Sequence, residues 1–118
     1  AVFVDRSDVS LGVVKKNLSG TPFDDCVKLI KSDYKTFLSK TADTFDIAFL
    51  DPPYGAGVLE DAVRCVSDKM SDFGIIICEH PSEINLPEKV NDFVTLKTYK
   101  FGKIKATVFR KERTENEL

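Results

Sequence analysis

The first two thirds of the chain alternate between short apolar runs and stretches with helical periodicity. The apolar runs occupy residues 1–4, 26–30, 45–50 and 73–78. Each run is short for a helix and lacks polar alternation, which is typical of strands buried on both faces of a parallel sheet. The helical segments between them occupy residues 6–18, 34–40 and 58–70. This alternation predicts an α/β fold with a mostly parallel sheet and helices on both of its faces.

The pattern changes in the last third of the chain. Residues 82–92 form a polar connection, whereas residues 93–101 and 104–111 are rich in strand-forming side chains and meet near Gly102. We interpret these last two segments as an antiparallel β-hairpin. Such a hairpin fits at one edge of the predicted sheet.

Composition sets the broad class of the protein. A chain of 118 residues is the size of one domain, which we place at residues 1–111, with a charged tail at 112–118. No apolar run approaches the length of a membrane span, so we expect no membrane partner. Three widely spaced cysteines in or beside apolar segments, Cys26, Cys65 and Cys78, predict buried thiols in a reducing compartment and hence a cytoplasmic location. A single histidine argues against a histidine-based metal site, and we expect no metal.

The third apolar run, residues 45–50, ends in an unusual turn. Asp51 follows the run, and Pro52, Pro53 and Tyr54 follow at once. Neither proline can continue a central strand, because each lacks a backbone N–H and has a fixed φ. The turn therefore presents a carboxylate, backbone carbonyls and an aromatic ring together. It is either a rigid turn or part of a site, and its position after a buried strand favours a site.

Acidic residues also follow the other predicted strands. Asp5, Asp33 and Asp51 come at or just after the first three runs, and Glu79 follows the fourth. In open α/β sheets, ligands bind beyond the carboxyl ends of the strands. We therefore expect the four carboxylates to lie on one rim and to mark a ligand site. As an alternative, Asp5 and Asp33 could simply be helix N-caps.

The turn motif and its surroundings resemble a known family. An Asp-Pro-Pro-Tyr segment after a strand is the signature of S-adenosylmethionine-dependent methyltransferases that modify exocyclic amino groups of nucleic-acid bases. Further matches are Ala-Val-Phe-Val-Asp at 1–5, Asp33 with Phe37-Leu38, residues 45–54, Cys-Glu-His at 78–80, and Tyr-Lys-Phe-Gly before the last strand. Together these resemble the RsmD family, whose members methylate a guanine N2 of 16S ribosomal RNA. The resemblance runs from residue 1 to about residue 111 and implies a Rossmann-like methyltransferase fold.

The resemblance also implies an RNA methyltransferase and a set of site residues. The methyl donor would be S-adenosylmethionine, and the partner would be 16S ribosomal RNA or a small-subunit assembly intermediate. The motif residues Asp51, Pro52, Pro53 and Tyr54 would form the catalytic part. The Asp51 carboxylate and the Pro52 carbonyl would orient the amine, because catalysis at so weak a nucleophile is largely positioning. Tyr54 would stack a base that has left its helix.

Three residues match the cofactor-binding positions of that family. Asp5 would accept hydrogen bonds from the ribose hydroxyls, and Asp33 would contact the adenine amino group. Tyr34 would border the adenine, or would simply pack within an amphipathic helix. Glu79 and His80 match a family segment, and we expect a structural or peripheral RNA-contacting role for them.

One family feature has no counterpart in the sequence. The first strand of the family and its glycine-rich cofactor loop should precede Ala1, whereas the glycines here are scattered at 12, 20, 55, 57, 74 and 102. We therefore expect an N-terminally truncated chain that binds the cofactor poorly on its own. A homodimer that covers the strands left exposed is a further expectation.

Other functions remain open at this point. A DNA adenine-N6 methyltransferase uses the same motif, and a non-catalytic RNA-binding or assembly module is a third possibility. The net charge of −2 argues against indiscriminate nucleic-acid binding but leaves room for a local basic patch. The C-terminal region supplies the candidate cations Lys97, Lys100, Lys103, Lys105, Arg110, Lys111 and Arg113. They form either a solvated sheet edge or a phosphate-contacting patch.

Overall fold

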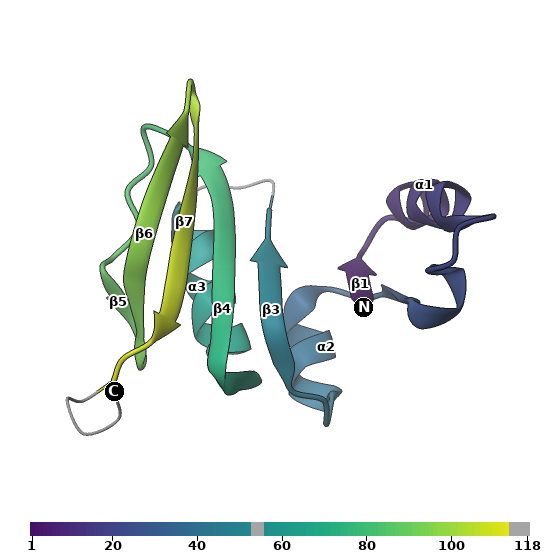
Figure 1. The fold of residues 1–118 in the computed structure, drawn as a ribbon, viewed down its shortest axis with the longest axis horizontal. Helices are drawn as coiled ribbons and strands as arrows, with labels where there is room; N and C mark the ends of the chain where they lie inside the picture. Colours follow the sequence, from purple (N-terminus) through teal and green to yellow (C-terminus); the bar gives the residue numbers. More distant parts are fainter. Residues whose placement is uncertain (53–55, 114–118) are drawn as a thin grey trace. The chain divides into compact units, whose positions relative to one another are not determined.

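The computed structural model describes residues 1–52 and 56–113, which divide into two compact units (Figure 1). The first unit is Ala1–Thr41 and the second is Ala42–Leu118. Each unit is built around its own sheet, and the two are described separately below.

The first unit is a small parallel α/β arrangement. Its elements are β1 (Val2–Asp5), α1 (Asp8–Leu18), the 3-10 turn η1 (Asp24–Cys26), β2 (Lys28–Lys31) and α2 (Tyr34–Lys40). The two strands pair in parallel, with Val2 opposite Lys28 and Asp5 opposite Lys31. Parallel pairing of strands separated by a helix is the βαβ connection that the sequence predicts.

The second unit is a five-stranded mixed sheet with one helix. Its elements are β3 (Phe45–Leu50), α3 (Ala56–Ser67), β4 (Met70–Pro81), β5 (Lys89–Val90), β6 (Phe93–Phe101) and β7 (Ile104–Lys111). The strand order is β3-β4-β7-β6-β5 (Figure 1). The strands β3 and β4 pair in parallel, whereas the remaining pairs are antiparallel. The predicted hairpin is confirmed, because β6 and β7 have the predicted bounds.

The core of the second unit lies between α3 and one face of this sheet. Leu59, Ala62, Val63 and Val66 are buried, and their spacing gives the helix a single apolar stripe. The sheet contributes the buried side chains Ile76, Cys78, Val90, Phe93 and Phe109. The predicted apolar face of this helix is therefore confirmed.

The expectation that the early strands are buried on both faces was wrong for β1, β2 and β3, because none of their residues is buried. Ile47 and Phe49 are both well exposed. Side chains alternate between the two faces of a strand, so residues 47 and 49 point to the same face. Only α3 covers the sheet in the part of this unit that the structure describes, and it packs against the other face.

Some element boundaries differ from the predicted ones. The helix predicted to reach residue 70 ends at Ser67, and β4 already begins at Met70, where it pairs with Phe45. The strand predicted from residue 26 begins at Lys28, because residues 24–26 form η1. Cys26 is consequently exposed, so the prediction of three buried thiols holds only for Cys78, and Cys65 is intermediate.

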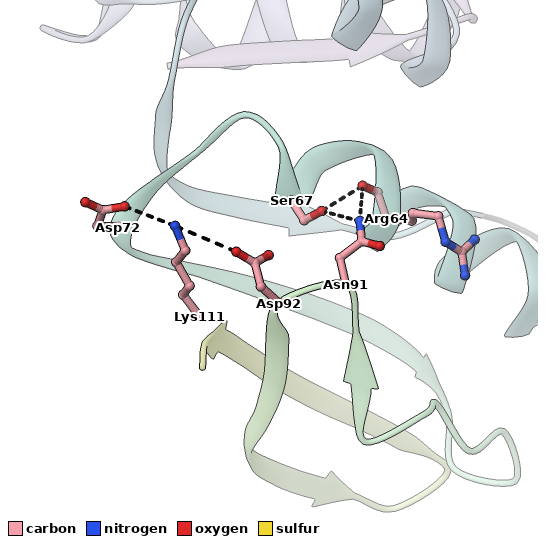
Figure 2. A network of polar contacts seen from close by, with 6 residues as sticks. All are labelled: Arg64, Ser67, Asp72, Asn91, Asp92 and Lys111. Carbon is pink, nitrogen blue, oxygen red and sulfur yellow. Dashed lines mark hydrogen bonds and ion pairs between the residues drawn. The ribbon is translucent and has the colours of Figure 1, made fainter. Parts of the chain in front are cut away.

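A turn between β5 and β6 ties this edge of the sheet to the end of α3 (Figure 2). Asn91 has a φ of 52°, a left-handed conformation that asparagine tolerates better than most residues. Its Nδ2 donates to the Ser67 hydroxyl oxygen at 2.9 Å and to the Arg64 carbonyl oxygen at 3.3 Å. The Ser67 hydroxyl donates to the same Arg64 carbonyl at 2.8 Å, so Asn91 joins a closed set of contacts at the last turn of the helix.

A second set of polar contacts fixes the end of β7 (Figure 2). The Lys111 ammonium lies 3.1 Å from an Asp72 carboxylate oxygen and 3.7 Å from one of Asp92. The hydrogen bond and the charge of Asp72 raise the pKa of Lys111. This lysine is therefore engaged within the fold.

Candidate active site

Asp51 and Pro52 follow the last residue of β3 and line a cleft of about 500 Å³ in the second unit. The other lining residues come from α3, the end of β4, the segment after it and the hairpin turn. They are Leu59, Glu79, His80, Pro81, Glu83, Ile84, Lys103 and Ile104.

The pairing of β3 with β4 brings two predicted carboxylates together. Leu50 lies opposite Cys78 in the parallel register, so the next residues, Asp51 and Glu79, lie side by side. Asp51 follows the end of β3, whereas Glu79 lies within β4, two residues before its last residue, Pro81. Asp51 is exposed and Glu79 is half-buried, and both line the cleft. The expected convergence of carboxylates is therefore seen for these two residues, but the prediction that the fourth strand ends at Glu79 was wrong.

The hairpin turn closes another side of the cleft. Pro81 at the end of β4 lies opposite Ile104, the first residue of β7. The Ser82 amide donates to the Lys103 carbonyl oxygen at 2.8 Å, which holds the turn beside the end of β4. Nothing in the sequence associates Lys103 and Ile104 with the Asp51 turn, because the pairing of β4 with β7 is what brings them to the cleft.

His80 is buried beside the cleft and bonded at both ring nitrogens. Its Nε2 lies 2.8 Å from the Thr107 hydroxyl oxygen, and its Nδ1 lies 3.0 Å from the Pro81 carbonyl oxygen. A carbonyl only accepts, so Nδ1 donates and, in the neutral ring, Nε2 accepts from the Thr107 hydroxyl. The expected structural role of His80 fits this position, since the bond to Thr107 links β4 to β7.

The candidate cofactor residues belong to the first unit. Asp5 is the last residue of β1, and its Oδ1 accepts from the Ser7 amide at 2.8 Å. Ser7, and not Asp5, is the N-cap of α1. Tyr34 is the first residue of α2.

Asp33 is the N-cap of α2, which is the structural alternative considered for it. Its Oδ1 accepts from the Thr36 amide and its Oδ2 from the Thr36 hydroxyl, both at 2.8 Å. These hydrogen bonds, with a smaller contribution from the charge of Arg6, lower the pKa of Asp33 below its ordinary value. Each carboxylate oxygen still has a second lone pair, so capping leaves it able to accept from a ligand.

The remaining predicted site residues are Pro53 and Tyr54, which lie outside the residues that the structure describes. Within residues 1–52 and 56–113, no group of three or more histidine, cysteine or acidic side chains is arranged to hold a metal ion. In the same ranges no helix is long and apolar enough to cross a membrane.

Six of the seven basic C-terminal residues divide into two groups, and the seventh, Arg110, lies on β7 with its Nε atom buried. Lys111 pairs with Asp72, and the Arg113 guanidinium lies 4.3 Å from the centre of the Phe73 ring, so both are engaged within the fold. Lys97, Lys100, Lys103 and Lys105 lie on the β6–β7 hairpin or its turn. We call these four residues the hairpin lysines. In the described part of the chain none of them takes part in an ion pair.

Solved structures share this arrangement of strands and helices. A "conserved hypothetical protein" of Streptococcus pyogenes matches with a TM-score of 0.87 and 24% identity, over 95% of this chain and 71% of that one. The "Putative methyltransferase yhhF" of Escherichia coli matches with a TM-score of 0.73 and 19% identity, over 97% of this chain and 65% of that one. The chain thus has the Rossmann-like α/β fold of S-adenosylmethionine-dependent methyltransferases.

The chain belongs to the family described as "Conserved hypothetical protein 95", whose model matches residues 1–110. This is the RsmD-like family, so the resemblance found in the sequence is confirmed. A relative in Bacillus subtilis (strain 168), named "Putative rRNA methyltransferase YlbH", is 28% identical over 115 residues. The match covers 93% of this chain and 62% of that relative, so the chain spans somewhat less than two thirds of its length.

Proposed function

We propose that this chain carries the base-binding part of an RNA methyltransferase that acts on the exocyclic N2 amine of a guanine in small-subunit ribosomal RNA. The observation that carries the proposal is the position of Asp51 and Pro52 on the cleft at the carboxyl end of β3. Membership of the RsmD-like family and the name of the Bacillus subtilis relative support an RNA substrate.

The chemistry of an exocyclic amine explains why these two residues suit the reaction. The amine is a poor nucleophile because its lone pair is delocalised into the ring. The Asp51 carboxylate accepts a hydrogen bond from one amino N–H, and the Pro52 carbonyl accepts a hydrogen bond from the other. Two acceptors on consecutive residues fix the plane of the amine and turn its lone pair toward the methyl group. The Asp51 charge also stabilises the positive charge that develops on the nitrogen.

The cleft has the size and lining that an extruded base requires. A volume of about 500 Å³ lies within the usual range of roughly 300–1,000 Å³ for small-molecule sites. Pro81 and Ile84 give apolar surface for the ring, and Asp51 and Glu79 give acceptors for its edge. A base must leave its helix to reach such a cleft. We keep Tyr54 as the proposed stacking partner and Pro53 as part of the same rigid turn.

The cofactor that this family fold implies is S-adenosylmethionine, which supplies an electrophilic methyl group when bound. Asp5 and Asp33 fit its adenosine part, because Asp5 is the last residue of β1 and Asp33 follows the end of β2, its parallel partner. We propose that Asp5 accepts from the ribose hydroxyls and Asp33 from the adenine amino group, with Tyr34 beside the adenine.

Methyl transfer from labelled S-adenosylmethionine tests the proposal directly. The chain is incubated with naked 16S ribosomal RNA, with partly assembled small subunits and with duplex DNA, and the digested nucleosides are separated. With S-adenosylmethionine in excess, to offset the weak cofactor binding expected of this chain, label in N2-methylguanosine from RNA is the expected result. Label in N6-methyladenine from DNA would instead support the second enzyme class, and RNA binding without transfer would support a non-catalytic module. Calorimetry with S-adenosylmethionine shows whether this chain binds the cofactor.

A further inference from the structure

We propose that the β6–β7 hairpin is an RNA-binding surface on which nucleotides next to the target base stack. The surface consists of Tyr99 and Phe101, here called the aromatic platform, with Lys97 on the same face of β6 and Lys103 in the turn. The inference rests on the proposed function, because it assumes that an RNA base enters the cleft.

The two rings of the aromatic platform form an ordered pair in solvent. Tyr99 and Phe101 are two residues apart on β6 and therefore share one face of the strand. Their centroids are 6.4 Å apart and their planes differ by 14°. Tyr99 is 42% exposed and Phe101 is 66% exposed. The Lys97 ammonium lies 4.8 Å from the centre of the Tyr99 ring, so a cation and two rings follow one another along the strand.

Folding does not account for these exposed rings. On the opposite face of the same segment of β6, Thr98 and Lys100 are exposed as well. This part of the hairpin therefore has solvent on both faces, and Phe101 in particular buries little surface there. Exposed aromatic side chains beside cations are what single-stranded nucleic acids bind, because every base has a face that can stack.

The hairpin lysines add an electrostatic cost that a bound phosphate would relieve. Lys100 lies directly opposite Lys105 in the register of β6 and β7. Like charges directly opposite one another destabilise a sheet. No acidic side chain in the described part of the chain pairs with either lysine. This pair lies on the face of the hairpin opposite to the aromatic platform, and a phosphate group bound there would neutralise the repulsion.

The hairpin surface is continuous with the cleft. Phe101 lies opposite Ile104, and Tyr99 lies opposite Ala106. Ile104 and its neighbour Lys103 line the cleft. An RNA strand whose target base enters the cleft thus meets Phe101, the cross-strand partner of the cleft residue Ile104, and then Tyr99. Nucleotides that flank the target are the ligands that this arrangement fits.

Binding of a fluorescently labelled single-stranded RNA, followed by anisotropy across a range of salt concentrations, tests this surface. The variants are Tyr99→Ala, Phe101→Ala and their combination. Phe73→Ala is the matched control, because Phe73 is 76% exposed and also has a cation, Arg113, over its ring. Circular dichroism checks that each variant keeps its fold.

We expect each platform variant to weaken RNA binding about 5–150-fold, as the loss of one stacked base predicts, with the salt dependence unchanged. Phe73→Ala should bind like the wild type. Replacing Lys100 and Lys103 together by alanine should instead reduce the salt slope by about 1.4, at roughly 0.7 for each phosphate contact on a single strand.

Methyl transfer measured in the same samples separates this inference from the proposed function. A wild-type chain that methylates RNA, with a Tyr99→Ala/Phe101→Ala variant that binds RNA equally well, would overturn the platform alone. Binding that depends on both rings without any methyl transfer would overturn the proposed function and leave the platform standing. A wild-type chain that does not bind RNA would overturn the platform as well.

Discussion

The Nε2 atom of His80 lies 2.8 Å from the hydroxyl oxygen of Thr107, and this buried contact joins β4 to β7 beside the cleft. Thr107→Val keeps the shape of the side chain but removes its hydroxyl. We expect the variant to lose about 1–3 kcal/mol of unfolding free energy, because a buried ring nitrogen is left without a partner. Urea denaturation followed by circular dichroism measures the loss.

Thr98→Val is the matched control for this prediction. Thr98 lies directly opposite Thr107 in the sheet but is exposed. Its replacement should change the unfolding free energy by no more than about 0.5 kcal/mol. Equal denaturation midpoints for the two variants would show that the contact between His80 and Thr107 contributes nothing to stability.

The cysteines should differ sharply in reactivity. Burial raises the pKa of the Cys78 thiol to about 12, and only a thiolate reacts readily with alkylating reagents. Cys26 is exposed. At pH 8 we therefore expect iodoacetamide to label Cys26 in the folded protein and Cys78 only after a denaturant is added. Peptide mass spectrometry reads out both sites, and Cys78 labelling as fast as that of Cys26 would contradict the buried position.

The close contact of β3 and β4 around Gly74 predicts a second stability effect. A Cβ atom at this position would lie 2.9 Å from Met70 Cε and 3.1 Å from the carbonyl oxygens of Phe45 and Ser71. The backbone oxygens cannot move without disturbing the strands, so Gly74→Ala should cost about 1–3 kcal/mol.

Gly57→Ala serves as the control, because Gly57 lies in α3 and a Cβ atom there would meet nothing within 4 Å. We expect this variant to be neutral or more stable by up to about 1 kcal/mol, since alanine is the better helix former. If Gly74→Ala proved as stable as Gly57→Ala, the crowding inferred at β4 would be wrong.

The N-cap of α2 predicts a pH dependence in the acid range. The pKa of Asp33 lies below its ordinary value of 3.8, chiefly because of the hydrogen bonds from Thr36. A carboxylate with a lowered pKa contributes stability above the unfolded pKa, and this contribution is lost as the pH falls through the folded value. Stability should therefore decline below about pH 4.

Asp33→Asn should flatten that decline, because asparagine also caps a helix but does not titrate. The comparison consists of thermal unfolding of the two proteins between pH 5 and pH 2. An identical pH dependence for both would show that Asp33 is not a source of the acid sensitivity.

Local patterns in the sequence were enough to predict most elements of the fold. The stripe of apolar residues in α3 and the bounds of β6 and β7 depend on neighbours a few positions away, and such patterns are visible in a single chain. The beginning of β4 at Met70 was missed because Ser71 and Asp72 are polar and interrupt the apolar run. The exposure of Phe49 was missed because burial depends on what covers a sheet, which periodicity does not report.

The candidate site was predicted less completely. The carboxyl ends of parallel strands predict that Asp51 and Glu79 converge. The contribution of Lys103 and Ile104 depends on pairing between distant strands and could not be predicted. The same reason applies to the link between Asn91 and Ser67, whose hydrogen bond spans 24 residues of sequence.

The central claim is that the Asp51 carboxylate orients the base amine. Its most direct test is the rate of methyl transfer to ribosomal RNA by Asp51→Ala, with Asp68→Ala, an exposed acidic residue at the end of α3, as the control. Loss of one preorganised polar contact to the reacting group should lower the rate by about 10²–10³-fold. Asp68→Ala should transfer methyl groups like the wild type. A rate for Asp51→Ala equal to that of the wild type would contradict the account.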